Sequence, residues 1–195
     1  MTSELGVRER KKLAARTALT ESALKLFREN GFDATTVNDI AHLAGMSPRT
    51  FFRYFDTKED VVFQDTSRHL DTLRRLLRNR SSGESNSIAL RAALISFSEV
   101  LEGEREELHL RAQLSRAART LAERAAIELQ NWRLALTEEL LRRGGDHDHT
   151  RCRLLAGAGV HVLAVAITLR SDGDRSLPEL TDHCWQQLTE VVVST

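Results

Sequence analysis

Side chains that can hydrogen bond to nucleic acid cluster in one short segment, at Arg49, Thr50, Arg53 and Tyr54. A single α-helix fits the major groove of duplex DNA and can present such side chains to it. The pattern therefore predicts a short helix that contacts DNA. Many helical proteins contain a short helical hairpin without touching DNA, so the prediction needs support from neighbouring segments.

A basic segment precedes this cluster. Residues 8–16 include five basic side chains and one acid, Glu9, which gives a net charge of +4. Such a segment suits the phosphate backbone of DNA, and the alternative interpretation is a solvated basic tail. The whole chain has 28 basic and 28 acidic residues, so its overall charge gives no reason to propose a nucleic-acid partner. The basic segment and the helical cluster together favour DNA binding.

Two helices are expected ahead of the cluster. An apolar stripe at helical spacing predicts a first helix over about residues 10–30, ended by Gly31. Thr36, followed three residues later by Asp39, is a start signal for a second helix of under three turns. Gly45 ends this second helix and supplies the turn of a helical hairpin.

The cluster itself lies on the predicted third helix. Ser47 is expected as its N-cap and Pro48 as its first residue, where the missing N–H costs nothing. Three phenylalanines are expected to bury this helix against the first two: Phe51, Phe52 and Phe55. A further start signal at 57–60 predicts a long fourth helix that reaches about Asn79.

The rest of the chain is predicted to be helical. Residues 81–87 contain no apolar side chain and form the clearest polar break. Past the break, helices are predicted at about 88–102, 104–116, 118–143, 150–170 and 178–192. No stretch shows sustained alternation of apolar and polar residues, so β-structure has almost no support. The sequence predicts an all-α protein with a small N-terminal domain at 1–56 and a larger helical bundle at 57–195.

Several classes of protein are not favoured. Cys152 and Cys184 lie 32 positions apart without a CxxC spacing, which indicates neither a zinc site nor a secreted disulfide framework. No apolar stretch follows the charged N-terminus, so no secretory signal is expected. The apolar run at 154–169 has 16 residues and includes His161, whereas a membrane span needs roughly 20 residues. We expect no metal, no cofactor, no membrane segment and a cytoplasmic location.

Taken together, the N-terminal motifs resemble the DNA-binding domain of the TetR family of transcriptional regulators. The resemblance covers roughly residues 10–63. It rests on five runs: GF at 31–32, TTVNDIA at 35–41, AGMS at 44–47, TFFRYF at 50–55 and KEDV at 58–61. It implies an N-terminal helix-turn-helix domain, followed by a helical bundle for ligand binding and dimerisation.

The resemblance also implies roles for individual residues. Phosphate contacts are expected from Thr36, Arg53, Tyr54 and Lys58. Base-edge contacts are expected from Ser47, Arg49 and Thr50, of which Arg49 is favoured because a guanidinium can bond guanine O6 and N7 together. Phe52 departs from the family, which commonly has a tyrosine there, and its contact with DNA would be apolar only. Structural alternatives stay open: Thr36 as a helix cap, Tyr54 at the rim of the core and Arg49 merely solvated.

In the family, the last two long helices of each subunit form a four-helix dimer interface. The small residues at 156–159 and the segment around Trp185, Leu188 and Val192 fit that role. Ligand-pocket candidates combine apolar bulk with positions expected to face inward: Phe97, Val100, Leu101, Leu114 and Trp132. His161 is more often a core histidine, and we retain it as a further pocket candidate. The run at 47–60 resembles mycofactocin-type members of the family, which suggests an acyl-CoA-like effector.

The sequence therefore predicts a homodimeric, ligand-responsive transcription regulator and not an enzyme. We expect a repressor that binds a palindromic operator and is released by a small apolar or acyl-type effector. One alternative is a DNA-binding dimer without a small-molecule effector. Another is an enzyme that would use His147, His149 and Cys152, for which no activating neighbour can be identified. Residues 147–149 are more simply a solvated connector.

Overall fold

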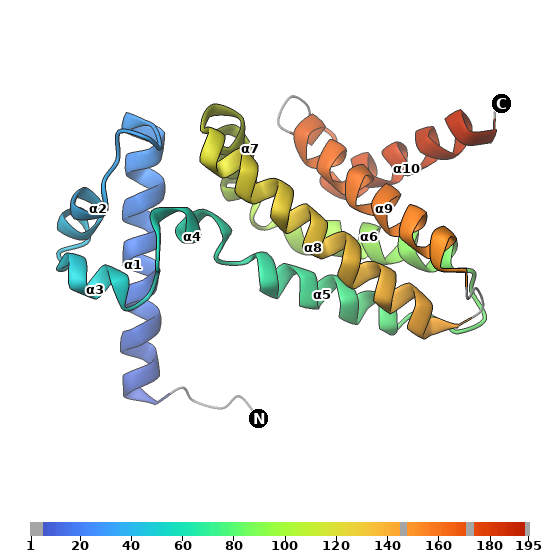
Figure 1. The fold of residues 1–195 in the computed structure, drawn as a ribbon, viewed down its shortest axis with the longest axis horizontal. Coiled ribbons are helices and arrows are strands. Elements are labelled where there is room, and N and C mark those ends of the chain that lie inside the picture. Colours follow the sequence, from blue (N-terminus) through green and yellow to red (C-terminus); the bar gives the residue numbers. More distant parts are fainter. Residues whose placement is uncertain (1–5, 145–147, 171–173, 194–195) are drawn as a thin grey trace. The chain divides into compact units, whose positions relative to one another are not determined.

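The structure is a computed structural model that describes residues 6–144, 148–170 and 174–193. Over these ranges it contains ten α-helices and no β-strand (Figure 1). The prediction of an all-α protein is therefore confirmed. The chain divides into two compact units. One comprises the chain up to Gln64 together with Leu114–Ala122, and the other comprises the remaining described residues. The predicted division at residues 56 and 57 stays a prediction.

The first unit contains α1 (Val7–Asn30), α2 (Val37–Leu43), α3 (Pro48–Phe52) and α4 (Lys58–Phe63). Helix α1 packs on α2 and α4, and α2 packs on α3. The contact face of α1 is apolar at a spacing of four residues, where Leu19, Ala23 and Phe27 are buried. Helix α1 begins three residues earlier than predicted, so the whole basic segment at 8–16 is helical.

Local capping explains why α2 and α3 begin where they do. The Asp39 backbone N–H donates to Thr36 Oγ1 (3.2 Å), and the Thr36 N–H donates to Asp39 Oδ2 (2.9 Å). At α3, the Thr50 N–H donates to the Ser47 hydroxyl at 3.2 Å, and proline occupies the first turn. Between the two helices, Gly45 adopts a φ of +66°, a left-handed conformation that favours glycine. These local signals produce the helix-turn-helix that the sequence predicts.

Two of the three phenylalanines of the α3 segment anchor it. The side chains of Phe51 and Phe55 are 0% and 4% exposed, and their ring centroids lie 5.4 Å apart. The expectation that Phe52 is also buried is wrong, because its side chain is 55% exposed. Adjacent helical residues point about 100° apart, so Phe52 leaves the buried face that Phe51 occupies. Its ring meets the edge of the Phe51 ring at 5.6 Å.

The predicted long fourth helix is wrong in one respect, because it is broken into two. Helix α4 ends at Phe63, and α5 (Thr66–Arg78) begins three residues later. The two residues between them are held by distant partners. The Gln64 side chain accepts from Arg16 and Thr20 of α1, each at 3.2 Å. The Asp65 carboxylate accepts from Arg111 at 3.0 Å.

The second unit is the helical bundle. It contains α5, α6 (Asn86–Glu102), most of α7 (Arg105–Ala117) and of α8 (Arg119–Arg143), α9 (His149–Arg170) and α10 (Leu177–Val193). The boundaries of α6 to α10 lie within two residues of the predicted ones. Helix α6 is central, since it packs on α5, α9 and α10. Its side chains Leu90, Leu94 and Phe97 are completely buried.

Helix α9 approaches α6 closely at a glycine. A Cβ atom at Gly159 would lie 2.9 Å from Leu90 Cδ2 and 3.2 Å from Leu94 Cδ1. The absence of a side chain at Gly159 therefore sets the distance between the two helices.

Among the described residues, one helix, α9, is long and apolar enough to cross a membrane by length and composition alone. Its most apolar window is 39% buried inside the structure, and the helix packs on α6 and α10. A core helix of this kind passes the same test of length and hydropathy.

Candidate nucleic-acid interface

The front end of α3 is a solvent-exposed, polar surface. Ser47, Pro48 and Arg49 are exposed and Thr50 is half-buried. The Ser47 hydroxyl caps the helix and lies 3.0 Å from Thr50 Oγ1, so these two side chains hold one another in place. In the part of the chain that the structure describes, the Arg49 side chain has no hydrogen-bond or ion-pair partner. Its five N–H donors are available to an outside acceptor.

Behind this front end, α3 is fixed by its aromatic anchors. Phe51 and Phe55 enter the core of the first unit on the side away from Arg49. The exposed residues of α3 are therefore presented by a rigid support, which contact with base edges requires. Figure 1 shows α2 and α3 lying on one side of α1.

Arg53 and Tyr54 form a pair at the end of α3. The Arg53 guanidinium donates to the Tyr54 hydroxyl at 3.1 Å and lies 5.0 Å from the centre of its ring. The Tyr54 hydroxyl can still donate its own proton to an acceptor such as a phosphate oxygen. Arg53 and Phe52 are both exposed beside it, and Tyr54 is half-buried.

Thr36 serves as a helix cap in this structure. Its hydroxyl donates to Asp39 Oδ2 at 2.6 Å and accepts from the Asp39 backbone N–H. These side-chain and backbone hydrogen bonds from Thr36 hold the pKa of Asp39 below its usual value. Thr36 is exposed. A phosphate contact from Thr36 stays a prediction beside its observed capping role.

The Lys58 side chain forms hydrogen bonds within the first unit. Its ammonium group donates to the carbonyls of Phe32 (2.6 Å), Thr35 (2.9 Å) and Asp33 (3.4 Å). It also lies 4.3 Å from the centre of the Phe32 ring. The side chain thus ties the start of α4 to the turn after α1. Its predicted phosphate contact is untested, and the contacts observed are structural.

The predicted pocket residues do not all face inward. Phe97 and Leu101 are buried, and Trp132 is half-buried with its ring centroid 5.8 Å from that of Phe97. The inward placement of Val100 is wrong, because its side chain is 45% exposed on the solvent face of α6. Its neighbour Leu101 occupies the buried face instead.

Two other pocket candidates lie elsewhere. His161 is exposed on α9, so the expectation of a core histidine is wrong for this chain. Leu114 is buried and belongs to the first unit. Among the pocket candidates, the structure therefore brings together Phe97 and Trp132.

An open cleft of about 830 Å³ lies in the second unit, and no predicted pocket residue lines it. Its polar side is the segment Ser82–Ser87 with Gly144 and Arg151. Its apolar side is formed by Leu154, Leu155, Ala158 and Leu188. The sequence identified the polar segment only as a break between helices.

The residues of the enzyme alternative do not form a visible site. His147 lies outside the described residues. His149 is exposed and Cys152 is 1% exposed, with Cys152 Sγ at 3.8 Å from the Asn86 side-chain nitrogen. Within 6–144, 148–170 and 174–193 there is no group of three or more His, Cys, Asp or Glu side chains that could hold a metal ion.

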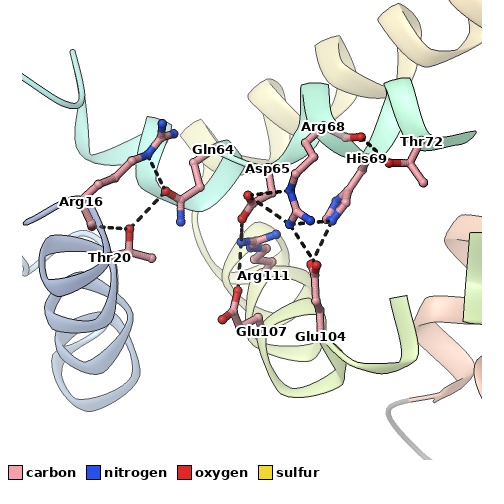
Figure 2. A network of polar contacts seen from close by, with 10 residues as sticks. All are labelled: Arg16, Thr20, Gln64, Asp65, Arg68, His69, Thr72, Glu104, Glu107 and Arg111. Carbon is pink, nitrogen blue, oxygen red and sulfur yellow. Dashed lines mark hydrogen bonds and ion pairs between the residues drawn. The ribbon is translucent and has the colours of Figure 1, made fainter. Parts of the chain in front are cut away.

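Sequence reasoning missed a charged network where α5 begins (Figure 2). Asp65 pairs with Arg111 and Arg68, and Arg68 donates to Glu104 at 2.9 Å. Burial alone would raise the pKa of Asp65, but hydrogen bonds and charge from Arg111 and Arg68 outweigh it and hold that pKa below its usual value. No local sequence motif predicts this network, because its members lie up to 46 positions apart in the chain.

His69 joins the same network from the inside of the bundle. Its Nε2 atom lies 2.9 Å from Glu104 Oε2, and its ring meets the Phe97 ring edge-on at 6.0 Å. Burial lowers the pKa of His69 despite the nearby Glu104 carboxylate, so the neutral ring is favoured. A buried histidine therefore connects the network to the apolar core.

The exposed helix α3 and the helical bundle of the second unit define the chain as a helix-turn-helix protein with an all-helical second unit. Residues 19–64 match the family model described as bacterial regulatory proteins, tetR family. This segment of the chain is therefore a TetR-family helix-turn-helix domain.

Two curated relatives match beyond the N-terminal domain. The putative mycofactocin biosynthesis transcriptional regulator MftR of Mycobacterium tuberculosis is 33% identical over 127 residues, which cover 65% of this chain and 64% of MftR. The HTH-type transcriptional regulator TcmR of Streptomyces glaucescens is 32% identical over 152 residues, covering 77% and 63%. The chain thus spans less than two thirds of the length of either relative.

Solved structures share the whole fold. FadR of Thermus thermophilus, a TetR-family repressor solved with lauroyl-CoA, is 25% identical with a TM-score of 0.56, covering 90% of this chain and 93% of FadR. The fatty acid degradation regulator FadR of Bacillus halodurans has a TM-score of 0.63 at 20% identity, covering 95% and 96%. The second likeness shows the fold alone.

Proposed function

We propose that this chain is a transcription regulator that binds duplex DNA with α3 in the major groove. The observation that carries the proposal is the exposed Arg49 guanidinium at the front of a helix anchored by Phe51 and Phe55. Ser47 and Thr50 lie beside it and supply hydroxyl groups. Arg53 and Tyr54 provide donors for phosphate oxygens around this front end, and Thr36 would contact a phosphate by exchanging the hydrogen bond that its hydroxyl donates to Asp39.

The binding unit is a homodimer. Helices α9 and α10 retain exposed apolar side chains in the single chain, with Leu154, Leu169 and Val191 at 69%, 43% and 71% exposure. A second copy of the chain would cover them. Two α3 helices about one helical turn apart, ~34–36 Å, would then bind a near-palindromic operator.

An acyl-type effector controls this binding, and the protein acts as a repressor in the cytoplasm. Support comes from the T. thermophilus FadR structure, which was solved with lauroyl-CoA. Because effector and DNA binding are linked, an effector that weakens DNA binding must itself bind less tightly to the DNA complex by the same factor.

A dimer without a small-molecule effector is the second candidate. It is favoured by the complete burial of Phe97 and the near-complete burial of Leu101, which pack in the core and do not line the open cleft.

Enrichment of random-sequence duplexes by the purified protein tests the DNA-binding proposal. We expect an inverted repeat whose half-sites lie about 10 base pairs apart, or a multiple of this distance. Failure to enrich any sequence would contradict the proposal. Lauroyl-CoA, titrated into the complex with the enriched duplex, then separates the two candidates. Release by lauroyl-CoA but not by coenzyme A supports the effector-controlled regulator, and unchanged binding supports the effector-free dimer.

A further inference from the structure

The first two turns of α1, residues 7–14, extend beyond the packed part of the first unit. Every residue from 6 to 14 is exposed, and the first completely buried side chain of α1 is Leu19. Figure 1 shows α1 running past α2 and α3 toward its N-terminus. This extension therefore has no packing role within the first unit, although it is continuous with a well-packed helix.

The extension places basic side chains on the face that is apolar further along the helix. Lys12 precedes Leu19 by seven positions and Ala23 by eleven, spacings that put all three on one side of an α-helix. Arg8 precedes Lys12 by four positions and continues the same line. The side of α1 that packs on α2 and α4 is thus cationic where it emerges from the domain.

Arg16 marks the transition between the two halves of this face. Its guanidinium lies 5.3 Å from the centre of the Phe55 ring, and its Nε donates to Gln64 at 3.2 Å. Through these contacts, the basic face of α1 lies against the C-terminal ends of α3 and α4. Arg8 and Lys12, one and two turns further out, have no hydrogen-bond or ion-pair partner among the residues that the structure describes. Lys11 borders them and is exposed as well.

The remaining basic residue of the segment lies on the other side. Arg10 is two positions from Lys12, a rotation of about 200° around the helix. It aligns instead with Thr17 and Glu21, seven and eleven positions later, which are both exposed. The extension therefore has a cationic face and a solvent face that can be tested separately.

We propose that Arg8, Lys11, Lys12 and Arg16 form a basic ridge that holds the phosphate backbone of duplex DNA next to the bases contacted by α3. The proposal rests on the proposed function and adds a second contact surface to it. Arg8 and Lys12 are exposed cations one turn apart, with no hydrogen-bond or ion-pair partner among the described residues, and they match the repeating negative charge of a DNA strand. The ridge would lengthen the footprint on DNA without adding base specificity.

The salt dependence of DNA binding tests the ridge. The affinity for a random-sequence duplex and for the enriched duplex is measured against salt for the wild type, an Arg8→Gln/Lys12→Gln variant and the matched control Arg10→Gln. Each lost phosphate contact should reduce the slope of log K against log[salt] by about 0.9, or by about 1.8 for each DNA-bound chain of the double variant. Between 50 and 200 mM salt, the factor by which affinity falls should therefore be about twelve times smaller, for each DNA-bound chain, in the double variant than in the wild type. The control should keep the wild-type slope.

Three outcomes separate the possible failures. Equal slopes for the double variant and the wild type would overturn the ridge. A reduction in Arg10→Gln about half as large as in the double variant would also overturn it, because each lost charge would then act alike whichever face of the helix carries it. If the wild type binds neither duplex, the proposed function itself fails. Circular dichroism should show unchanged unfolding for both variants, since all three substituted side chains are exposed.

Discussion

Asp65, in the break between α4 and α5, accepts a hydrogen bond from Arg111 of α7 at 3.0 Å. The same carboxylate pairs with Arg68 at 3.2 Å (Figure 2). Arg111 in turn contacts Glu107 at 3.2 Å on its own helix. The residue that interrupts the predicted long helix is thus tied to a helix of the bundle.

The Asp65–Arg111 pair should stabilise the protein through a coupled interaction. In a double-mutant cycle with Asp65→Asn and Arg111→Gln, we expect a coupling of about 1–3 kcal/mol, since both partners are largely shielded from solvent. The i,i+4 pair Arg124–Glu128, whose arginine side chain is 43% exposed, provides the control, with about 0.3–0.5 kcal/mol expected. The measurement is urea unfolding of each variant. Similar couplings for the two pairs would show that Asp65 does not anchor the break.

Glu139 should give the protein an acid-sensitive stability. Its side chain is 2% exposed, and its Oε2 atom lies 2.7 Å from Arg78 and 2.9 Å from Arg142. Burial alone would raise the pKa of Glu139, but these arginines and Arg74 outweigh it and hold the pKa below its usual value. The stabilisation is therefore present above the unfolded pKa of about 4.3 and is lost as pH falls through the lower folded pKa.

Glu139→Gln should accordingly lower the free energy of unfolding by about 3 kcal/mol at neutral pH. The difference from the wild type should shrink as pH falls below the folded pKa, because the wild-type carboxyl is then protonated. Glu138→Gln, at the exposed neighbouring position, is the matched control and should be near neutral. A penalty for Glu139→Gln that does not change with pH would argue against the ionised carboxylate as its cause.

The close approach of α9 to α6 predicts opposite effects at two glycines. Gly159→Ala should destabilise the protein by about 1–3 kcal/mol, because the added methyl group would press on the fully buried Leu90 and Leu94. Gly157→Ala should be neutral or stabilise by up to about 1 kcal/mol, since the nearest atom, Arg133 Cδ, is 3.9 Å away. Urea unfolding of both variants measures the difference. Equal stability would contradict the close contact.

Lys58 should matter for folding even without DNA. Lys58→Met removes three donor contacts to backbone carbonyls, and we expect a loss of about 1–3 kcal/mol in the free energy of unfolding. Lys25→Met, at an exposed position of α1, is the control. A stable Lys58→Met variant with weakened DNA binding would instead assign Lys58 to a phosphate.

The helix-turn-helix could be predicted because its signals are local. The cap at Ser47, the proline after it and the pairing of Thr36 with Asp39 each act within four residues. The same locality explains why the exposed front end of α3 was predicted from the sequence. That Arg49 has no partner among the residues that the structure describes, by contrast, depends on the whole fold and could not be read from local signals.

Long-range contacts and helix faces account for what the sequence did not reveal. The break at Asp65 contains neither glycine nor proline, and its partner Arg111 lies 46 positions away. The sequence also predicted an inward Val100, because α6 has apolar residues on several sides. The structure shows that Leu90, Leu94, Phe97 and Leu101 occupy its buried face. Periodicity alone could not choose between these faces.

The central claim is that the front end of α3 contacts bases, and Arg49 tests it most directly. Binding of the enriched duplex, and of duplexes with one base pair changed in each half-site, is measured for the wild type and for Arg49→Ala. The account predicts that Arg49→Ala loses about 1–3 kcal/mol of affinity and loses its preference at one base position. Unchanged affinity and unchanged preference at every position would contradict it.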